Sequence, residues 1–368
     1  MTALTTHVSR EPDAGSRGLA FGRANAAAVG RTVERYRRIF SELLGLDDAG
    51  IRAAGERVST ALTGHPGLVD EITGIAEGAG VRAAELFAVN ARSEVLGSSG
   101  RPECSVLAVE PTAFGAGVLL AQNWDWYPDF GDSLIWWQVA AGERGWFATL
   151  TEAGVLAKIG INSRGVGVTL NRLISSGDQV GDGMPVHLAI RLVLERAERL
   201  DDAVALLAGQ RYDASSAITL GGAGPTGPSV ASVEVSPSGV SVVRPDGAGR
   251  LAHTNHFLIP PSQGSDAGPG RWPDSLGRFA CATAGLAGFA VDAEQAKATL
   301  RSHEGFPRSI CAHVDESLPY LETGSTLASV VMDLGAPSVE MAWGQPCTSE
   351  YVALPLFADV TGTGGSRR

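Results

Sequence analysis

The spacing of the apolar residues changes at Cys104, and this change most limits the folds that the chain can adopt. Before it, the segment from Ala20 to Leu46 carries apolar side chains at helical spacing, with Arg and Glu between them. Directly after it, the run from Ser105 to Val109 alternates in the way that is typical of a strand. The chain therefore joins a helical section to a section built mainly of strands.

Both sections divide further at their Gly and Pro residues. Shorter helices are predicted at 51–62, 68–78 and 83–96, a helix pair begins near Val186, and helices follow at 275–287 and 292–302. Strands are predicted at 104–110, 116–123, 133–140, 145–151, 154–160, 166–171, 216–220, 230–236 and 239–243, with a late hairpin at 326–333 and 338–343. Because strands and helices come in blocks rather than in strict alternation, we expect antiparallel sheets covered by helices.

Three parts of the chain are expected from these patterns. Residues 1–18 are polar and are predicted to be a loose tail. Residues 19–103 form the helical section, and residues 104–368 form the strand-rich domain. A chain of 368 residues can bury a large core, and layered folds of this size often form one body.

Charge and hydropathy exclude some kinds of partner. The net charge is −11, and the only lysines are Lys158 and Lys297, so no basic stripe is available for a nucleic-acid backbone. No stretch approaches the ~20 apolar residues that span a bilayer, so we expect no membrane partner. The first residues show no signal-peptide pattern, and the default expectation is a cytoplasmic protein.

The four cysteines are far apart and include no CxxC pair: Cys104, Cys281, Cys311 and Cys347. In a chain this long, their spacing predicts neither a disulfide framework nor a zinc site. The sequence also has no GxGxxG that leads from a predicted strand into a predicted helix, no P-loop and no GxSxG motif, which are the markers of dinucleotide binding, phosphate binding and serine hydrolases. We therefore expect no cofactor and no metal.

Polar side chains occur at the ends of several predicted strands and helices, where catalytic groups are usually mounted. They are the segments 123–125, 171–172, 253–257 and 274–279. Cys104 begins one strand, and Asp125 lies at the end of the next. A thiol and a carboxylate in this arrangement suit a nucleophile and its orienting acid.

Five motifs follow one another in an order that resembles a known family. They are Cys104 at the head of a strand, Gln-Asn-Trp-Asp-Trp at 122–126, Gly-Ile-Asn-Ser-Arg-Gly-Val-Gly-Val-Thr-Leu-Asn at 160–171, His-Thr-Asn-His-Phe at 253–257 and Asp-Ser-Leu-Gly-Arg-Phe at 274–279. Together they resemble the acyl-CoA:6-aminopenicillanic acid acyltransferase family of N-terminal-nucleophile hydrolases, which is related to the bile-salt hydrolases and penicillin V acylases. The resemblance extends from about Ala20 to about Leu356.

This resemblance implies an α+β fold, a four-layer αββα sandwich made as a precursor that cuts itself before the nucleophilic cysteine. The scissile bond would join Glu103 to Cys104, and the helical section would become the small subunit of a self-cleaved heterodimer. Cys104 would act through its thiol, with its freed α-amine as general base. The two groups titrate near ~8.5 and ~8, so a proton passes between them at little cost. Asp125 would orient the α-ammonium.

The resemblance also assigns three further residues. Asn255 would supply an amide donor to the oxyanion, with the backbone N–H of Asn171 as its partner, and such donors contribute roughly 3–4 kcal/mol each. Arg278 would lower the pKa of the thiol or hold Asp125. The substrate would be a small-molecule amide or an acyl-CoA, which the enzyme hydrolyses or whose acyl group it transfers.

Two departures from the family pattern stand out. Members often have Gly before the nucleophile, whereas this chain has Glu103. The bulk of Glu103 would slow the transfer of the acyl group from nitrogen to sulfur during self-cleavage, or its carboxylate would assist that transfer. Gln122 stands where the bile-salt hydrolases place an Arg, which fits the acyltransferase branch better.

Other interpretations of the same residues stay open. A papain-type dyad of Cys104 and His253 is a different mechanism for the same chemistry. His253 and His256 lack a third convergent ligand in the sequence, so they do not predict a metal site. A different class of function is a catalytically silent, uncleaved relative that acts as a binding or structural protein.

Overall fold

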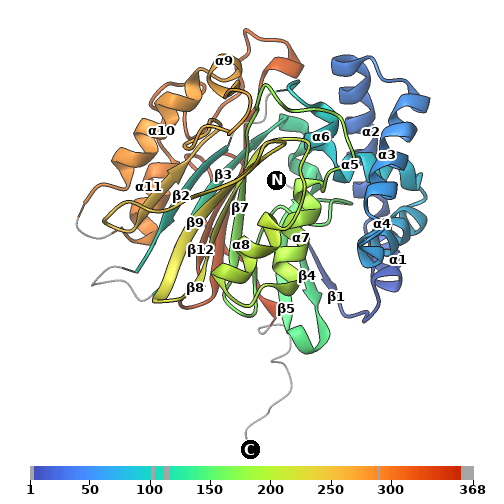
Figure 1. Ribbon diagram of the computed structural model, residues 1–368, viewed down its shortest axis with the longest axis horizontal. Helices are drawn as coiled ribbons and strands as arrows, with labels where there is room; N and C mark the ends of the chain where they lie inside the picture. The colour runs from blue at the N-terminus through green and yellow to red at the C-terminus, as the bar shows by residue number, and fades with distance from the viewer. Residues whose placement is uncertain (1–3, 101–103, 112–116, 289–290, 358–368) are drawn as a thin grey trace, which may run out of the picture.

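The computed structural model describes residues 4–100, 104–111, 117–288 and 291–357, and within them two β-sheets form the centre of the molecule (Figure 1). The first sheet has the order β1-β4-β5-β6-β7-β8-β9-β10, and the second has the order β11-β2-β3-β12-β13-β14. The first comprises β1 (Thr5–Ser9), β4 (Leu134–Ala140), β5 (Trp146–Glu152), β6 (Ile159–Asn162), β7 (Gly167–Arg172), β8 (Ser216–Gly224), β9 (Gly227–Ser236) and β10 (Gly239–Val243). The second comprises β11 (Arg250–His253), β2 (Cys104–Val109), β3 (Leu119–Trp126), β12 (Ser325–Asp333), β13 (Ser338–Trp343) and β14 (Val352–Ala353).

The helices form three groups around these sheets. The first group is α1 (Ala14–Ala24), α2 (Ala26–Leu44), α3 (Asp48–Ala61), α4 (Pro66–Ala79), α5 (Ala83–Asn90) and α6 (Arg92–Leu96). The others are α7 (Val186–Arg196) with α8 (Leu200–Ala208), and α9 (Gly268–Arg271) with α10 (Asp274–Gly285) and α11 (Ala293–Leu300). Three 3-10 turns complete the described elements: η1 (Pro128–Ser133), η2 (Gly142–Arg144) and η3 (Tyr320–Glu322).

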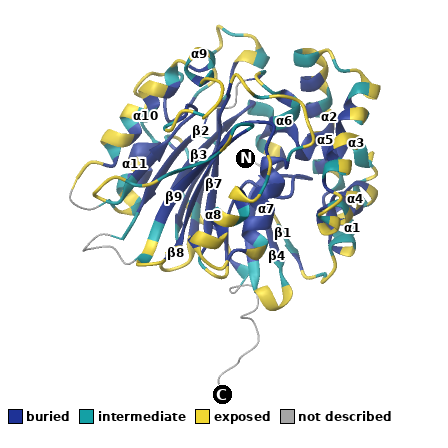
Figure 2. Cartoon of the chain, viewed as in Figure 1, coloured by how far each residue is buried: buried dark blue, intermediate teal, exposed yellow. Residues whose placement is uncertain are grey.

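The layers follow the order helix, sheet, sheet, helix, as the resemblance implies. Strands β2 and β3 of the second sheet pack against β7 and β8 of the first. Helices α7 and α8 cover the outer face of the first sheet, and α10 and α11 cover that of the second. Both faces of each central strand are therefore buried, and every residue of β2 and β3 is buried (Figure 2). A nucleophile on β2 thus lies inside the sandwich.

Helices α1–α6 gather on one side of the sandwich (blue to blue-green in Figure 1), and buried ion pairs join them to it. Glu71 of α4 accepts hydrogen bonds from Arg17 of α1 at 2.7 Å and from Arg191 of α7 at 2.6 Å. Arg92 of α6 pairs with Glu152 of β5 at 2.8 Å. All these side chains are at most 8% exposed, so separating this section from the sandwich would leave buried charges without partners.

The described part of the first 18 residues is not a loose tail, and this prediction was wrong. Strand β1 runs parallel to β4, and α1 begins at Ala14 with the Asp13 side chain accepting a hydrogen bond from Ser16 N. The indole N–H of Trp137 donates to Ser9 Oγ at 2.9 Å. A polar sequence pairs here because β4 would otherwise present an open edge. The β1–β4 pair also makes the first sheet mixed rather than purely antiparallel.

Most other predicted elements lie within a few residues of the observed ones, with three differences. The strand predicted at 154–160 begins only at Ile159, because Gly154 turns with φ +97° and Asn90 Oδ1 accepts a hydrogen bond from Leu156 N. The strand predicted at 116–123 runs from Leu119 to Trp126. Strands β11 and β14 were not predicted. Among the described residues, no helix is long and apolar enough to cross a membrane.

Candidate active site

Cys104 is the first residue of β2 and is 2% exposed. It lies opposite Trp124 of β3 in an antiparallel pair. Two residues further along β3 is Trp126, and between them lies Asp125. The strand register therefore brings the predicted thiol and the predicted carboxylate to the same end of the second sheet.

Three side chains from other elements hold the backbone of Cys104. Its N–H donates to Asn255 Oδ1 at 2.9 Å. Its carbonyl oxygen accepts from Asn171 Nδ2 at 2.9 Å and from Arg278 Nη1 at 2.9 Å. All three side chains are at most 1% exposed. The position of the thiol is thus fixed by hydrogen bonds that are shielded from water.

Arg278 connects the members of this group. From α10, which packs on β11 and β2, its guanidinium also donates to Asn255 Oδ1 at 3.0 Å and to Ser105 Oγ at 3.1 Å. Its Nε pairs with Asp274 one turn earlier on the helix, at 3.0 Å. A buried arginine with these acceptors is held in one geometry, which suits a positioning role beside Cys104, the predicted nucleophile.

Asp125 lies near the end of β3, one of whose neighbours in the second sheet is β12. Its Oδ1 accepts a hydrogen bond from Thr326 Oγ1 at 2.6 Å, and the two residues are partners in the β3–β12 register. Asp125 is 1% exposed and lines a small cleft together with Ala312 and His313. Asp125 also acts electrostatically on the Cys104 thiol. The structure therefore brings all five predicted site residues together: Cys104, Asp125, Asn171, Asn255 and Arg278.

The pKa of the Cys104 thiol is raised, and its largest cause is burial. The Asp125 carboxylate raises this pKa further, whereas the cations of Lys158 and Arg278 lower it. Burial prevails, so the thiol is favoured in its protonated form at neutral pH. Forming the thiolate then depends on a proton acceptor and on nearby positive charge.

Lys158 was not predicted as a site residue. Its Nζ lies 4.3 Å from the ring centroid of Trp124, the cross-strand neighbour of Cys104. Burial lowers the pKa of Lys158 to about 8. The sequence did hold a signal, since Lys158 is one of only two lysines and follows the apolar run Val155–Ala157. A lysine in such surroundings is a candidate for proton transfer.

The two asparagines contact the backbone of Cys104, a contact that was not part of their predicted oxyanion roles. Asn255 uses its Oδ1 on the nitrogen of Cys104, and its Nδ2 donates to the carbonyl oxygen of Arg172 at 2.9 Å. Asn171 contacts Cys104 through its side chain rather than through its backbone N–H. The oxyanion roles of both residues stay predictions, and the observed contact of Asn255 is with the atom that would become the α-amine.

His253 does not offer a free nitrogen to Cys104. Its Nε2 lies 2.9 Å from Glu234 Oε1, and its Nδ1 lies 2.9 Å from the carbonyl oxygen of Thr254. Because a carbonyl oxygen can only accept, Nδ1 is the donor in the second contact, and both ring nitrogens are already engaged. These contacts argue against the papain-type dyad. Glu103 and its peptide bond to Cys104 lie outside the described residues.

Side chains that could hold a metal ion lie in a separate group. His303, Cys311, His313 and Cys347 each offer one ligand atom, and these atoms all lie within 4.8 Å of one another. The expectation of no metal rested on sequence spacing, which does not show that these loops meet.

An αββα sandwich with a buried cysteine at the head of a central strand is the arrangement of the N-terminal-nucleophile class of acyl-transferring and amide-hydrolysing enzymes. The chain belongs to the acyl-coenzyme A:6-aminopenicillanic acid acyl-transferase family, whose model matches residues 113–348. The matched range contains Asp125, Asn171, Asn255 and Arg278 and begins after Cys104.

Individual relatives show the extent of the similarity. The acyl-coenzyme A:6-aminopenicillanic-acid-acyltransferase 40 kDa form of Emericella nidulans is 28% identical over 300 residues, which is 80% of each chain. The N-acylethanolamine-hydrolyzing acid amidase ortholog of Caenorhabditis elegans has a TM-score of 0.45 at 18% identity, covering 68% of this chain and 100% of its own. The penicillin V acylase of Agrobacterium tumefaciens has a TM-score of 0.45 at 15% identity, covering 71% of this chain and 89% of its own.

Proposed function

We propose that the chain is a self-processing enzyme that cleaves or transfers an acyl group through an S-acyl-Cys104 intermediate. The observation that carries this proposal is the group around Cys104. Asn255, Asn171 and Arg278 fix its backbone, and its thiol lies in the electrostatic field of Asp125 and Lys158. A structural cysteine would not need three buried polar side chains on its own backbone atoms.

Self-processing would use the same thiol on the preceding peptide bond. The sulfur of Cys104 attacks the carbonyl carbon of Glu103, the C–N bond breaks, and the acyl group passes from nitrogen to sulfur. The proton of the thiol passes to the nitrogen, which becomes the α-amine of Cys104. Water then hydrolyses the thioester, which frees the Glu103 carboxylate and regenerates the thiol. Asn255 Oδ1 already accepts from this nitrogen, so it is placed to hold the α-amine that results.

Turnover would repeat this chemistry on a substrate. The α-amine takes the proton of the thiol, the thiolate attacks an amide or thioester carbonyl, and the protonated amine returns a proton to the leaving group. Arg278 and Lys158 stabilise the thiolate by their charge. Asp125 balances the positive charge that develops on the α-ammonium.

The substrate class is an acyl-CoA thioester or a small-molecule amide, and water or an amine accepts the acyl group. Family membership supports this choice, as does the name of the Emericella nidulans relative, which joins an acyl-CoA donor to an amine acceptor. The four cysteines are all free in the described residues, which suits a reducing compartment, and we propose the cytoplasm.

Intact mass spectrometry and denaturing electrophoresis of the purified full chain test the proposal. We expect two fragments that correspond to residues 1–103 and 104–368, still associated under native conditions. Cys104→Ala should give one uncut chain, whereas Cys281→Ser, a change at a cysteine outside the site, should be cut normally. Normal cutting of Cys104→Ala would overturn self-processing.

A thiol-directed acylating probe separates an active enzyme from the silent alternative. We expect the probe to label Cys104 at the new N-terminus, and we expect label to be released by water or an amine. A chain that stays uncut after long incubation and does not take up the probe at Cys104 would support the binding or structural alternative.

A further inference from the structure

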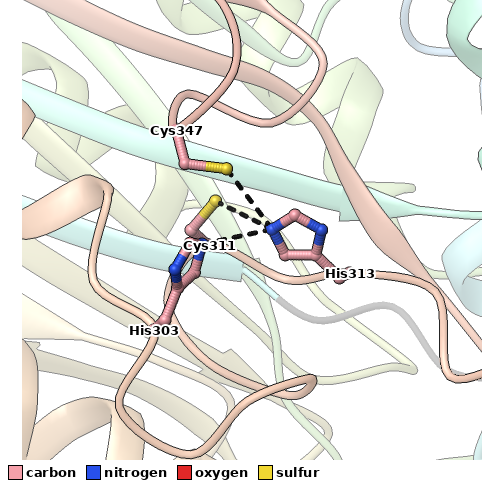
Figure 3. A group of neighbouring side chains, drawn as sticks. All are labelled: His303, Cys311, His313 and Cys347. Carbon is pink, nitrogen blue, oxygen red and sulfur yellow. Dashed lines mark hydrogen bonds between the residues drawn. The ribbon is translucent and has the colours of Figure 1, made fainter.

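Four side chains from two loops converge on one point outside the group around Cys104 (Figure 3). His303, Cys311 and His313 lie in the loop after α11, and Cys347 lies in the loop after β13. Each directs one nitrogen or sulfur atom toward the others (Figure 3). The set contains two imidazoles and two thiols, which is the Cys2His2 composition of tetrahedral zinc sites.

The three distances from His313 Nε2 match the edges of a tetrahedron of zinc size, and all six ligand-atom pairs lie within 4.8 Å. His313 Nε2 lies 3.2 Å from His303 Nε2, 3.4 Å from Cys347 Sγ and 3.7 Å from Cys311 Sγ. Zinc bonds of about 2.0–2.1 Å to nitrogen and about 2.3 Å to sulfur imply ligand separations of about 3.4 Å between nitrogens and about 3.6 Å between nitrogen and sulfur. The observed separations agree with these values to within a few tenths of an ångström.

Backbone hydrogen bonds hold the first loop in this shape. Cys311 N donates to the carbonyl oxygen of Ser302 at 3.0 Å, and His313 N donates to that of Pro307 at 2.9 Å. The second loop is attached to the start of the first loop at the residue before Cys347. There, Arg301 Nε donates to the carbonyl oxygen of Pro346 at 3.0 Å. These hydrogen bonds hold the two loops in position, in addition to the contacts between the ligand atoms themselves.

A disulfide between Cys311 and Cys347 is the competing interpretation. It would use two of the four groups and would leave unexplained why His303 and His313 direct their Nε2 atoms to the same point. A hydrogen-bonded cluster without metal is a second competing interpretation, and it does not explain why all four side chains are of types that bind zinc. Because the four atoms converge from both loops, a metal ion accounts for all of them at once.

We propose that His303, Cys311, His313 and Cys347 bind one zinc ion. Four protein ligands fill a tetrahedral shell and leave no position for a substrate, so the ion has a structural role. Cys311 is buried, while Cys347 is partly exposed and His303 is exposed, so zinc can reach the site from solvent. This inference concerns a separate group of residues and does not depend on the proposed acyl transfer.

The zinc site would fix a loop that lines the active-site end of the second sheet. Asn123 of β3 donates to the carbonyl oxygens of Leu300 and Ile310, each at 2.8 Å. Ala312, between two of the ligands, donates its N–H to Thr326 Oγ1 at 3.0 Å. The same hydroxyl donates to Asp125. A zinc ion bound to these loops would therefore hold Ala312 in place, and through Thr326 it would help to hold Asp125.

Metal analysis of the full chain, purified without an affinity tag or chelator, tests the proposal. In a Cys104→Ala background, which removes the catalytic thiol as a ligand, we expect about one zinc per chain. Cys347→Ser should reduce the content at least fivefold, and His303→Gln, at an exposed position, should reduce the affinity without disturbing the core. Cys281→Ser is the matched control and should keep the zinc.

Cobalt gives a second readout that does not depend on a variant folding. Replacement of zinc by Co²⁺ in the same protein should produce the visible bands of a tetrahedral ion and a thiolate charge-transfer band. Protein that takes up neither added zinc nor added cobalt would overturn the proposal. So would a Cys311–Cys347 disulfide found by peptide mass analysis of protein prepared without added oxidant.

Discussion

Cysteines occur in two clusters of polar side chains, one around Cys104 and one around Cys311 and Cys347, and the surroundings of the sulfur atoms differ between them. Around Cys104 the polar side chains form hydrogen bonds with the backbone of the cysteine. The sulfur itself is influenced electrostatically by the charges of Lys158, Arg278 and Asp125. Around Cys311 and Cys347 the polar atoms converge on the sulfurs themselves. The first arrangement suits a nucleophile that must meet a carbonyl carbon, and the second suits a ligand whose lone pairs share one cation.

The supporting elements differ in the same way. The groups around Cys104 come from strand ends and from α10, so sheet register and helix packing fix them. The ligands of the second group come from loops and are held by turns. Rigid elements are needed where sub-ångström placement affects a rate, whereas a metal can gather ligands from flexible loops and then stabilise them.

The largest expected difference between the two groups is in turnover. Replacing the sulfur by oxygen in Cys104→Ser should lower turnover by about 10³-fold or more, because the hydroxyl is a far weaker nucleophile at neutral pH. Cys347→Ser should change turnover per folded molecule by less than about tenfold while it removes the metal. Steady-state kinetics with a chromogenic amide or a thioester measures both. Equal losses in the two variants would contradict separate roles.

Removing Asn255 should have the next largest effect. Asn255→Ala deletes the acceptor for the nitrogen of Cys104 and should slow both self-cleavage and turnover by about 10²-fold. Asn162 is a matched control, because it is also buried and uses its side chain on backbone groups other than those of Cys104. Its Nδ2 donates to the carbonyl oxygens of Leu194 and Ala197, and its Oδ1 accepts from the N–H groups of two residues in the following turn. Asn162→Ala should lower the melting temperature and leave the rate per folded molecule nearly unchanged. Similar rates for both variants would remove Asn255 from the site.

Lys158 should act on the thiol through its charge. Because this cation lowers the pKa of Cys104, Lys158→Met should raise that pKa and move the alkylation profile of Cys104 to higher pH. The rate of alkylation at neutral pH should then fall roughly tenfold, as expected for the loss of one nearby charge. Lys297→Met, at the other lysine, removes an ion pair with Glu294 and Glu340 and should leave the profile in place. An unmoved profile in Lys158→Met would contradict the electrostatic role.

The group around Cys104 was predictable from the sequence because its members lie next to strand ends with recognisable motifs. Cys104, Asp125, Asn171, Asn255 and Arg278 do lie together. Toward Cys104, Asn255 uses its Oδ1 and Asn171 its Nδ2, while their oxyanion roles stay predictions. Which amide atom faces the cysteine depends on the neighbouring carbonyls, such as that of Arg172, and these come from the tertiary structure.

The second group could not be predicted from spacing, because its ligands come from two loops that meet only after the second sheet forms. Between Cys311 and Cys347 the chain passes through β12 and β13, so their separation in the sequence does not reflect their distance. Residues 5–9 were missed for a related reason. Their sequence is polar, and the edge of β4 rather than hydrophobic periodicity makes them a strand.

Thr326 is the point at which the two groups meet, and its change should have the smallest effect. Thr326→Val keeps the shape of the side chain but removes the hydrogen bond to Asp125 at 2.6 Å and the acceptor for Ala312 N at 3.0 Å. We expect a loss of about 1–2 kcal/mol in the free energy of unfolding, measured by urea denaturation. Turnover should fall only a few fold, since Asp125 keeps its place on β3.

Thr326→Ser is the matched control, because it restores the hydroxyl and should recover both values. The informative comparison is between metal-loaded and metal-free protein. If the metal holds the loop, loading should offset much of the loss of turnover in Thr326→Val and change the wild-type rate little. If loading changes neither variant, the two groups are energetically independent, and Thr326 serves Asp125 alone. Rescue by the metal would show that metal binding to the loops stabilises the position of Asp125 in the group around Cys104.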